Sequence, residues 1–507
     1  MRARALAALW LALALCGCAA REETAPGTLV IGVEAGPRTL DPRMYTDAAA
    51  SKAGDLLFNG LLARDGGGAL VPDLAESWEA PSPTRYVFHL RRGVTFHDGR
   101  PLTSRDVKAT LEWILDPANA SPRRSAFETL ASIETPDGGT VVCALTEPTS
   151  PFISELTQPI VPEGSGPEMA QRPMGTGPFA FVEYRHEERL ALRANPHYFE
   201  GAPKLRGVVF RIIPDETVRA LELERGGIHL LMNPITPDLL PRYRNNSGLR
   251  VAARAGTNYS YLGFNLEDPL TGDLAVRRAI AYALDRDSVI AHILKGLATP
   301  ARGLLAPVNE YHEPDVAVYP HDPARARAIL DEAGYRDPDG AGPLPRFTLR
   351  YATSQNELRK RIAEVFQWQL AQAGVGLDIR SYEWGAFYDS IREGTFQMFS
   401  LTWVGLYDPD IYRHIFHSAS LPPEGANRGR FRDGRVDALT ELGRHATGQE
   451  RRRAYSEVQK IVAEKLPYVS LWHGVNVAVM RANVHGFALA PDENLKSLRH
   501  VWIAKGE

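Results

Sequence analysis

The chain has 507 residues, too many for a single hydrophobic core, so two or three domains are expected. Hydrophobic residues make up 44% and charged residues 23% of the chain, as in an ordinary protein that folds in water. The 58 Lys and Arg residues nearly balance the 61 Asp and Glu residues, which argues against nucleic acid as the main partner.

The N-terminus has the pattern of a bacterial export signal. Arg2 and Arg4 precede the apolar run ALAALWLALAL, which is too short to be read as a membrane-spanning helix. The next residues, Leu15-Cys16-Gly17-Cys18, look like a lipobox, and Gly17 supplies the small residue needed before the cut. We therefore expect a signal peptide at 1–17 and lipidation of Cys18.

Residues 18–28 are then a lipidated polar tether between the anchor and the first domain. The alternative is a soluble secreted protein that is cut near Ala20. In either case Cys143 is the only cysteine left with a free thiol in the mature chain, because Cys18 is either lipidated or removed, so no intramolecular disulfide is expected. Its strand-like run, GTVVCAL, predicts a small buried apolar residue.

The segment 72–107 predicts a strand, a turn and the start of a helix in immediate succession. Apolar and polar residues alternate through YVFHL, with Tyr86, Phe88 and Leu90 on one side. His97-Asp98-Gly99 is typical of a turn. Thr103 then occupies an N-cap position with Asp106 three residues later, and an apolar helical stripe follows: Val107, Leu111 and Ile114.

The run PMGTGPF, residues 173–179, contains a Gly-Thr-Gly that could suggest a phosphate-binding loop. It lacks the Lys-Ser/Thr of a P-loop, and no helix pattern follows it. We interpret it as a tight turn that enters the strand FAFVEYR.

Residues 261–286 predict a strand followed by a helix. The helix carries an apolar stripe, made of Val276, Ile280, Ala283 and Leu284. A second helix is expected in HDPARARAILDEAGY, where Asp322 caps the start, Pro323 takes the first helical position and Gly334 ends it. Its inward residues are expected to be Ala326, Ile329, Leu330 and Ala333.

The following DPDGAG resembles part of a calcium loop. Ala341 stands where such a loop needs Asp or Asn, and no Glu closes it, so a simple turn is the interpretation. Residues 362–418 then read as helix, strand, helix and strand, which indicates an α/β lobe.

The segments 72–107, 261–286 and 362–418 closely resemble the family 5 extracellular solute-binding proteins, the lipoproteins that deliver oligopeptides, dipeptides, nickel and other solutes to ABC importers. The resemblance implies an α/β, two-lobe periplasmic binding protein of type II, in its large peptide-binding subclass, with an extra subdomain in the first lobe. Lobe I would comprise 29–54, 171–262 and 486–507, the extra subdomain 55–170, and lobe II 263–485.

The resemblance also implies the function. We expect a receptor without enzymatic activity or cofactor, most simply a monomer, that captures peptides between its lobes and delivers them to ABC permease subunits. The location would be the periplasm or cell envelope, with the lipid as the only membrane attachment. The strand that begins the segment 261–286 crosses between the lobes in relatives and is the expected hinge.

The positions that lie between the lobes in relatives supply the ligand-binding candidates. Asn258, Tyr259 and Tyr261 lie on the crossing strand, Trp384 lies in YEWGAF, and the run TWVGLYDPD holds the remainder: Trp403, Tyr407, Asp408 and Asp410. Aromatic rings give a peptide apolar contact area and carboxylates can meet its charged groups. The alternative for each aromatic is an ordinary core position, and for Asp408 a turn or cap.

One departure from the family pattern concerns Leu406. Well-known dipeptide and oligopeptide binders carry at this position an Asp that takes the peptide's α-ammonium group. The loop from Trp403 to Asp-Pro is also one residue shorter here, as in another branch that includes oligopeptide binders with larger cavities. Peptide remains the leading substrate class, but a dedicated site for a free N-terminus is not expected at Leu406.

Other chemistries find less support. Neither a Gly-x-Ser-x-Gly elbow nor a His-Glu-x-x-His zinc helix occurs. His414 and His417 have helical spacing, but one His pair without a third ligand does not predict a metal site. Two rivals stay open: the same fold binding nickel or a metal chelate, haem or a sugar derivative, and an exported lipoprotein hydrolase.

Overall fold

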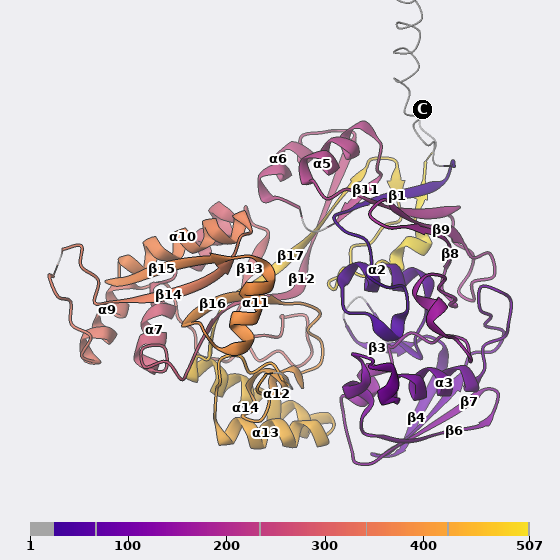
Figure 1. Cartoon of the computed structure of the whole chain (residues 1–507), viewed down its shortest axis with the longest axis horizontal. Coiled ribbons are helices and arrows are strands. Elements are labelled where there is room, and N and C mark those ends of the chain that lie inside the picture. Colours follow the sequence, from indigo (N-terminus) through magenta and orange to yellow (C-terminus); the bar gives the residue numbers. More distant parts are fainter. Residues whose placement is uncertain (1–24, 66–67, 233–234, 341, 423–424, 505–507) are drawn as a thin grey trace, which may run out of the picture.

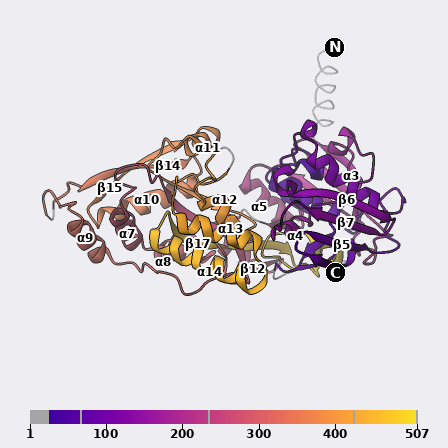
Figure 2. The same ribbon diagram turned by 90° about the horizontal axis from the view of Figure 1, so that it is seen from below.

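The computed structural model describes residues 25–65, 68–232, 235–340, 342–422 and 425–504. Within these ranges the chain forms two lobes, one built mainly from the indigo-to-magenta part of the sequence and one mainly from the orange part (Figure 1). Seen from below, the lobes lie side by side along the long axis (Figure 2). The predicted signal peptide, Cys18 and most of the tether lie outside the described residues.

A mixed sheet of eleven strands joins the two lobes. Its order is β15-β14-β16-β12-β17-β11-β1-β10-β9-β8, with β13 paired to β17. The strands are β1 (Thr28–Val33), β8 (Phe179–Arg185), β9 (Arg189–Ala194), β10 (Gly207–Ile212), β11 (Leu230–Met232), β12 (Leu249–Phe264), β13 (Ala298–Pro300), β14 (Phe347–Ser354), β15 (Val375–Tyr382), β16 (Met398–Trp403) and β17 (Tyr468–Arg481). Lobe I holds β1 and β8 to β11, and lobe II holds β13 to β16.

The central strands β12 and β17 cross from one lobe to the other. The first half of β12 pairs with residues 475–481 of β17 beside lobe I, and its second half pairs with β16 in lobe II. Between Ala255 and Tyr259 the register shifts, so Gly256, Thr257 and Asn258 stand outside the regular ladder. The crossing therefore coincides with an irregularity in the sheet, where the backbone is least constrained by neighbouring strands.

Lobe I places three helices around its strands, α2 (Ala48–Leu57), α5 (Glu216–Arg225) and α6 (Leu240–Arg244). The Gly-Thr-Gly motif is the predicted turn into β8, and its glycines are required by close packing. A Cβ on Gly175 would lie 2.1 Å from the carbonyl oxygen of Leu57, and one on Gly177 would lie 2.4 Å from that of Leu56. The motif therefore packs against the end of α2 instead of forming a phosphate loop.

The extra subdomain is a four-stranded antiparallel sheet covered by one helix. The strands follow the order β4-β5-β7-β6, and β2 and β3 form a separate hairpin. The elements are β2 (Leu62–Arg64), β3 (Leu70–Pro72), β4 (Ala75–Ser82), β5 (Arg85–Leu90), α3 (Ser104–Leu115), β6 (Leu130–Asp137), β7 (Thr140–Leu145) and α4 (Phe152–Glu155). The sequence predictions are confirmed here: Tyr86, Phe88, Leu90, Val107, Leu111, Ile114 and Cys143 are all buried.

The predicted N-cap of α3 is also present. The backbone N–H of Thr103 donates to the Asp106 carboxylate at 2.7 Å, which is the reciprocal bond of a capping box. Asp106 also accepts the backbone N–H of Glu163 at 2.8 Å. The cap therefore ties the start of α3 to the segment that returns to lobe I.

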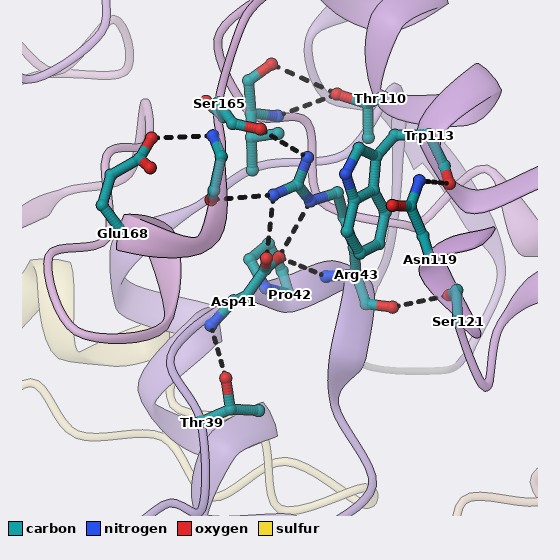
Figure 3. A network of polar contacts seen from close by, with 12 residues as sticks. Thr39, Asp41, Pro42, Arg43, Thr110, Trp113, Asn119, Ser121, Ser165 and Glu168 are labelled. Atoms are coloured by element: carbon teal, nitrogen blue, oxygen red, sulfur yellow. Dashed lines mark hydrogen bonds and ion pairs between the residues drawn. The ribbon is translucent and has the colours of Figure 1, made fainter. Parts of the chain in front are cut away.

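A buried arginine holds the subdomain against lobe I (Figure 3). Arg43, only 2% exposed, forms a bidentate pair with Asp41 and donates to the carbonyl of Ser165 at 3.1 Å. The Arg43 guanidinium carbon lies 3.9 Å from the centre of the Trp113 ring of α3. The Ser121 hydroxyl donates to the backbone carbonyl of Arg43 at 2.7 Å. These contacts fix the segment that begins one wall of the cavity described below.

Lobe II surrounds its strands with helices that include the two predicted ones. They are α7 (Leu274–Ala283), α8 (Arg286–Ser288), α9 (Pro323–Glu332), α10 (Glu357–Ala371), α11 (Trp384–Glu393), α12 (Ile411–Phe416), α13 (Gly434–His445) and α14 (Gly448–Lys465), with a π-helical turn at Val289–Ile293. The Asp322 side chain caps α9 as expected. Ala333 was expected to face inward, but it is exposed because α9 ends at Glu332.

Candidate ligand-binding cavity

A cavity of about 870 Å³ lies where lobe I, the extra subdomain and lobe II meet. Lobe I contributes α2 with the loop before it and the loop around residues 492–496, and the subdomain contributes residues 151–159. Lobe II contributes the loop 404–408 and the start of α12, while Asn258 comes from the irregular stretch of β12. Each part of the wall comes from a different section of the chain, so the cavity exists only in the folded two-lobe arrangement.

The lobe II wall is the loop between β16 and α12. Gly405 has φ +66°, a left-handed conformation that turns the chain sharply after β16. The Asp408 carboxylate accepts the backbone N–H of Asp410 at 2.8 Å and the Arg451 guanidinium at 2.7 Å. It also accepts the hydroxyl of Ser154 at 3.2 Å, and Ser154 belongs to the subdomain. Asp408 therefore shapes its own loop and contacts the opposite wall.

Tyr407 lies between the two lobes. The guanidinium carbon of Arg64, from β2, is 4.7 Å from the centre of its ring. Burial and the nearby Asp492, which hydrogen-bonds with its hydroxyl, raise the pKa of Tyr407, so the phenol stays protonated. Gly68 packs so closely that a Cβ there would lie 2.7 Å from the ring.

Asn258 and the C-terminal loop form the floor near the crossing strands. The Asn258 amide donates to Glu493 at 3.2 Å, and Glu493 also pairs with Lys52 of α2 at 2.9 Å. The neighbouring Thr257 donates its backbone N–H to the carbonyl of Pro491 at 3.2 Å. The irregular stretch of β12 is thus bonded directly to lobe I beside the cavity.

Tyr259 and Tyr261 are fully buried in the core of lobe II and do not line the cavity. Their rings stack with centroids 5.8 Å apart, and the ring of Tyr261 lies 4.0 Å from that of Tyr468. Tyr259 shares a 2.8 Å hydrogen bond with Ser470. Trp403 continues this stack, and the guanidinium carbon of Arg428 lies 4.7 Å from its ring centre.

The structure therefore brings four of the eight candidates to the cavity wall: Asn258, Tyr407, Asp408 and Asp410. Trp384 is the first residue of α11, and its side chain lies outside the described atoms. The Asp410 carboxyl accepts the hydroxyl of Tyr455 at 2.8 Å, and its pKa is raised by burial and by Asp408. Ligand contact by any of the eight stays a prediction.

Several wall residues carried no recognisable signal in the sequence. Glu155 pairs with Arg123 at 2.6 Å within the subdomain. Asp55 accepts the backbone N–H of Leu495 at 3.0 Å, and burial raises its pKa to about 6. Such residues sit in ordinary helical or loop patterns, and only the folded chain brings them to one cavity.

A smaller cavity of about 350 Å³ adjoins the first. The two share Asp55, Asn59, Arg64, Asn494 and Lys496 in their walls. It reaches Asp73, a buried residue of the segment 72–107 whose pKa is raised to about 6, mainly by burial. The two cavities are therefore neighbours that share part of their walls.

His414 and His417 have different surroundings. His414 lines the cavity, whereas His417 lies 3.3 Å from a Glu441 carboxylate oxygen on α13. Within the described ranges, no group of three or more His, Cys, Asp or Glu side chains could hold a metal ion. Across the same ranges no helix is both long and apolar enough to span a bilayer.

Comparisons with known proteins agree on one family. The family described as bacterial extracellular solute-binding proteins, family 5, middle, matches residues 69–420. The chain is 30% identical to di/tripeptide-binding protein 2 of Pseudomonas aeruginosa, over 97% of this chain and 98% of that protein. It is also 28% identical to heme-binding protein A of Haemophilus influenzae, over 96% of each chain.

A solved structure shares the fold over most of its length. The oligopeptide-binding protein AppA from Bacillus subtilis, in complex with a nonapeptide, superposes with a TM-score of 0.80 at 27% identity. The match covers 94% of this chain and 99% of that one. The mixed sheet and the two lobes are therefore the type II periplasmic-binding fold that the sequence predicts.

Proposed function

The chain belongs to the bacterial extracellular solute-binding proteins of family 5, and we propose that it is the receptor of an ABC importer that captures peptides between its two lobes. The observation that carries the proposal is the cavity of about 870 Å³ whose walls come from both lobes and the subdomain. A volume of this size lies within the usual range for a buried small ligand. A solute held there contacts both lobes at once.

Relatives support peptide as the solute class. The Pseudomonas aeruginosa relative is a di/tripeptide-binding protein, and the Bacillus subtilis structure holds a nonapeptide. The cavity offers what a peptide needs: the Asn258 amide, the Tyr407 ring, and the carboxylates of Asp408 and Asp410. Leu406, buried at 4% exposure, supplies no carboxylate, so the family resemblance gives no reason to expect an α-ammonium site at this position.

Closure follows from the shape of the crossing strands. The lobes are joined through β12 and β17, and the ladder of β12 is interrupted at 256–258 beside the cavity. Such a break is a site where a change in backbone angles rotates one lobe against the other. The ligand stabilises the closed form because only that form lets it contact both walls.

The proposal extends to the cell envelope. The receptor faces the periplasm, is anchored only by a lipid on Cys18, acts as a monomer, and hands its solute to membrane permease subunits. It carries out no catalysis and needs no cofactor. These points rest on the family membership and on the N-terminal sequence pattern.

A second candidate keeps the fold and changes the solute. The 28% identity to a heme-binding protein favours it, because this family accommodates non-peptide solutes on the same scaffold. Nickel or metal chelates and sugar derivatives fall in the same class. An exported lipoprotein hydrolase is the less supported alternative.

Native mass spectrometry of the exported protein, purified without denaturation, distinguishes these candidates. We expect a series of added masses that fragment into amino-acid residues. A single non-peptide mass or a metal would instead establish the second candidate. Hydrolysis of an added peptide would contradict a purely binding function.

A further inference from the structure

The walls of the interlobe cavity carry more carboxylates than cationic groups. Seven Asp and Glu residues line the cavity, against four Lys and Arg residues. The whole chain is nearly balanced, with 61 acidic and 58 basic residues. The acidic excess is therefore a local property of this cavity and needs its own explanation.

Three of the seven carboxylates have a cationic partner in the protein. Glu155 pairs with Arg123 at 2.6 Å and Glu493 pairs with Lys52 at 2.9 Å. Asp408 pairs at 2.7 Å with Arg451, which stands behind the wall. These pairs use two of the four cations that line the cavity, so they cannot neutralise the remaining carboxylates.

The other four carboxylates are held by neutral donors. Asp47 accepts the N–H of Ala50 at 2.8 Å, Asp55 that of Leu495 at 3.0 Å, Asp410 the hydroxyl of Tyr455 at 2.8 Å, and Asp492 the amide of Asn494 at 2.6 Å. Among the described residues, no Lys, Arg or His nitrogen forms an ion pair with these four. Their charges face a cavity that is large enough to hold a solute.

Several of these carboxylates also repel one another, and one of the repelling pairs, Asp408 and Glu155, spans the cavity. Burial comes first in raising the pKa of Glu155, on the subdomain, and Asp408 adds to it from across the cavity. Burial and Asp408, its neighbour on the same loop, also raise the pKa of Asp410, against the opposite effect of Arg444 and Arg451. Within lobe I, burial raises the pKa of Asp55 and Asp492 adds to it. Bringing the lobes together concentrates negative charge, and a positive charge placed between them would relieve the repulsion.

One lining cation is free to meet the opposite charge on a solute. Lys496 has no carboxylate oxygen within ion-pair distance among the described residues, although it lies close enough to favour ionisation of Asp55. Arg64 is instead engaged with the Tyr407 ring and with the carbonyl of Gly68 at 2.9 Å. A carboxylate at one end of a solute therefore has one natural partner, Lys496.

We propose that the preferred solutes are cationic peptides, with Lys or Arg side chains met by Asp410 on lobe II and Asp492 on lobe I. This inference rests on the proposed function and specifies its substrate class. The same two residues contribute to closure, because each lobe supplies one of them. Neutral peptides bind more weakly, and acidic peptides bind most weakly of all.

Isothermal titration calorimetry at pH 7.4 with Ala-Lys-Ala, Ala-Ala-Ala and Ala-Glu-Ala tests this order. At low salt we expect Ala-Lys-Ala to bind at least tenfold more tightly than Ala-Ala-Ala, and Ala-Glu-Ala at least tenfold more weakly. The differences should narrow at high salt, because the ions screen partly exposed charges. Equal affinities, or tightest binding of Ala-Glu-Ala, would overturn the inference while leaving peptide capture intact.

Substitution of the two carboxylates tests whether they cause the preference for Ala-Lys-Ala. Asp410→Asn and Asp492→Asn keep the shape and the hydrogen-bonding capacity, and each should lower the Lys-to-Ala affinity ratio several-fold. The matched control is Asp378→Asn on β15, whose carboxylate pairs with Arg380 away from the cavity and whose loss should leave the ratio unchanged. An unchanged ratio in both cavity variants would refute the assignment. Failure of every peptide to bind would overturn the proposed function itself.

Discussion

Asp408 shows how one side chain can serve both the fold and the site. The sequence left it open between a ligand contact and a turn residue, and the structure gives it a turn bond to the N–H of Asp410. Its partner Arg451 has a side chain only 7% exposed, so this is a largely buried ion pair. Removing the carboxylate would leave a buried guanidinium without a counter-charge.

We therefore predict that Asp408→Ala lowers the free energy of unfolding by about 3 kcal/mol, in addition to weakening solute binding. Urea unfolding of the apo protein measures the first effect. The control is Asp378→Ala, which breaks an exposed pair with Arg380 and should cost at most about 1 kcal/mol. Equal losses in the two variants would contradict a structural role for the Asp408–Arg451 pair.

Asp73 is a second residue whose environment could not be predicted from the sequence and is seen only in the structure. It lies in the segment 72–107, is 6% exposed, and accepts a hydrogen bond from the Asn59 amide at 2.8 Å. Burial raises its pKa from 3.8 to about 6, although Lys496 acts in the opposite direction. The ionised form is thus less favourable in the folded protein than in the unfolded chain.

The raised pKa of Asp73 makes the stability of the folded protein depend on pH. Between pH 4 and 6 the unfolded chain has already lost this proton while the folded protein retains it, so Asp73 destabilises the fold progressively as the pH rises. We predict that Asp73→Asn gains stability relative to the wild type from pH 4 to 6, by at most about 3 kcal/mol, and that the difference is constant above pH 7.

Urea unfolding of both proteins at a series of pH values checks this. Asp98→Asn is the control, because the pKa of the exposed Asp98 is lowered by its bonds to Arg100. Its effect should be constant through the same pH range and change only below it. A difference between wild type and Asp73→Asn that does not vary with pH would contradict the raised pKa.

At the scale of elements, local signals were the most predictable. The capping box at Thr103 and the stripe of α3 lie within twelve residues of one another, so sequence spacing alone specifies them. The start of α9 was equally clear from Asp322 and Pro323. Ala333 was misplaced because helix ends depend on where the next segment leaves the core, which spacing does not encode.

The crossing strand β12 also contains a glycine, Gly256, whose position leaves no room for a side chain. A Cβ on Gly256 would lie 2.5 Å from Asn476 Oδ1 and 2.9 Å from the carbonyl oxygen of Gly474 on β17. Asn476 is itself held by two bonds to the carbonyls of Ala490 and Pro491. There is therefore little space into which either strand could move.

We predict that Gly256→Ala lowers stability by about 1–3 kcal/mol and weakens solute binding, because the crossing strands must separate to admit the methyl group. Gly474→Ala is the matched control, since a Cβ there meets only Asn258 Cβ, at 3.9 Å. Thermal unfolding and calorimetry compare the two. Unchanged stability and unchanged solute affinity in Gly256→Ala would show that β12 and β17 can move apart here without cost, which would contradict the prediction.

At the scale of the whole molecule, the site could be predicted only in part. Residues 403–410 form a continuous motif, so Tyr407, Asp408 and Asp410 were found from sequence and do line the cavity. Asp55, Glu155 and Asp492 come from three distant segments, and nothing in their local patterns distinguishes them. Conversely Tyr259 and Tyr261 are buried because β12 has neighbours on both edges and packing on both faces, which alternation cannot reveal.

The two lobes also touch outside the cavity, where the end of α13 meets the loop before α4. The backbone N–H of Ser150 donates to the carbonyl of Arg444 at 2.9 Å, and its hydroxyl donates to that of Ala446 at 2.5 Å. His445 Nδ1 lies 2.6 Å from the carbonyl oxygen of Pro148. The last carbonyls of a helix have no partner within the helix, so the subdomain supplies one here.

Because these bonds join different lobes, they form only when the lobes are close, and they favour closure whatever the solute is. We predict that Ser150→Ala, which removes one such bond worth about 1 kcal/mol, weakens binding of every peptide by about the same factor of five, mainly through faster release. Stopped-flow measurements with the charged and neutral tripeptides, and with Ser132→Ala on the exposed face of β6 as control, test this. A loss confined to one peptide, or none at all, would mean that closure depends on the cavity alone. A uniform loss would show that this contact acts differently from Asp410 and Asp492, whose replacement should change the preference between peptides. The binding free energy would then have two parts, one from contacts between the lobes and one from contacts with the solute.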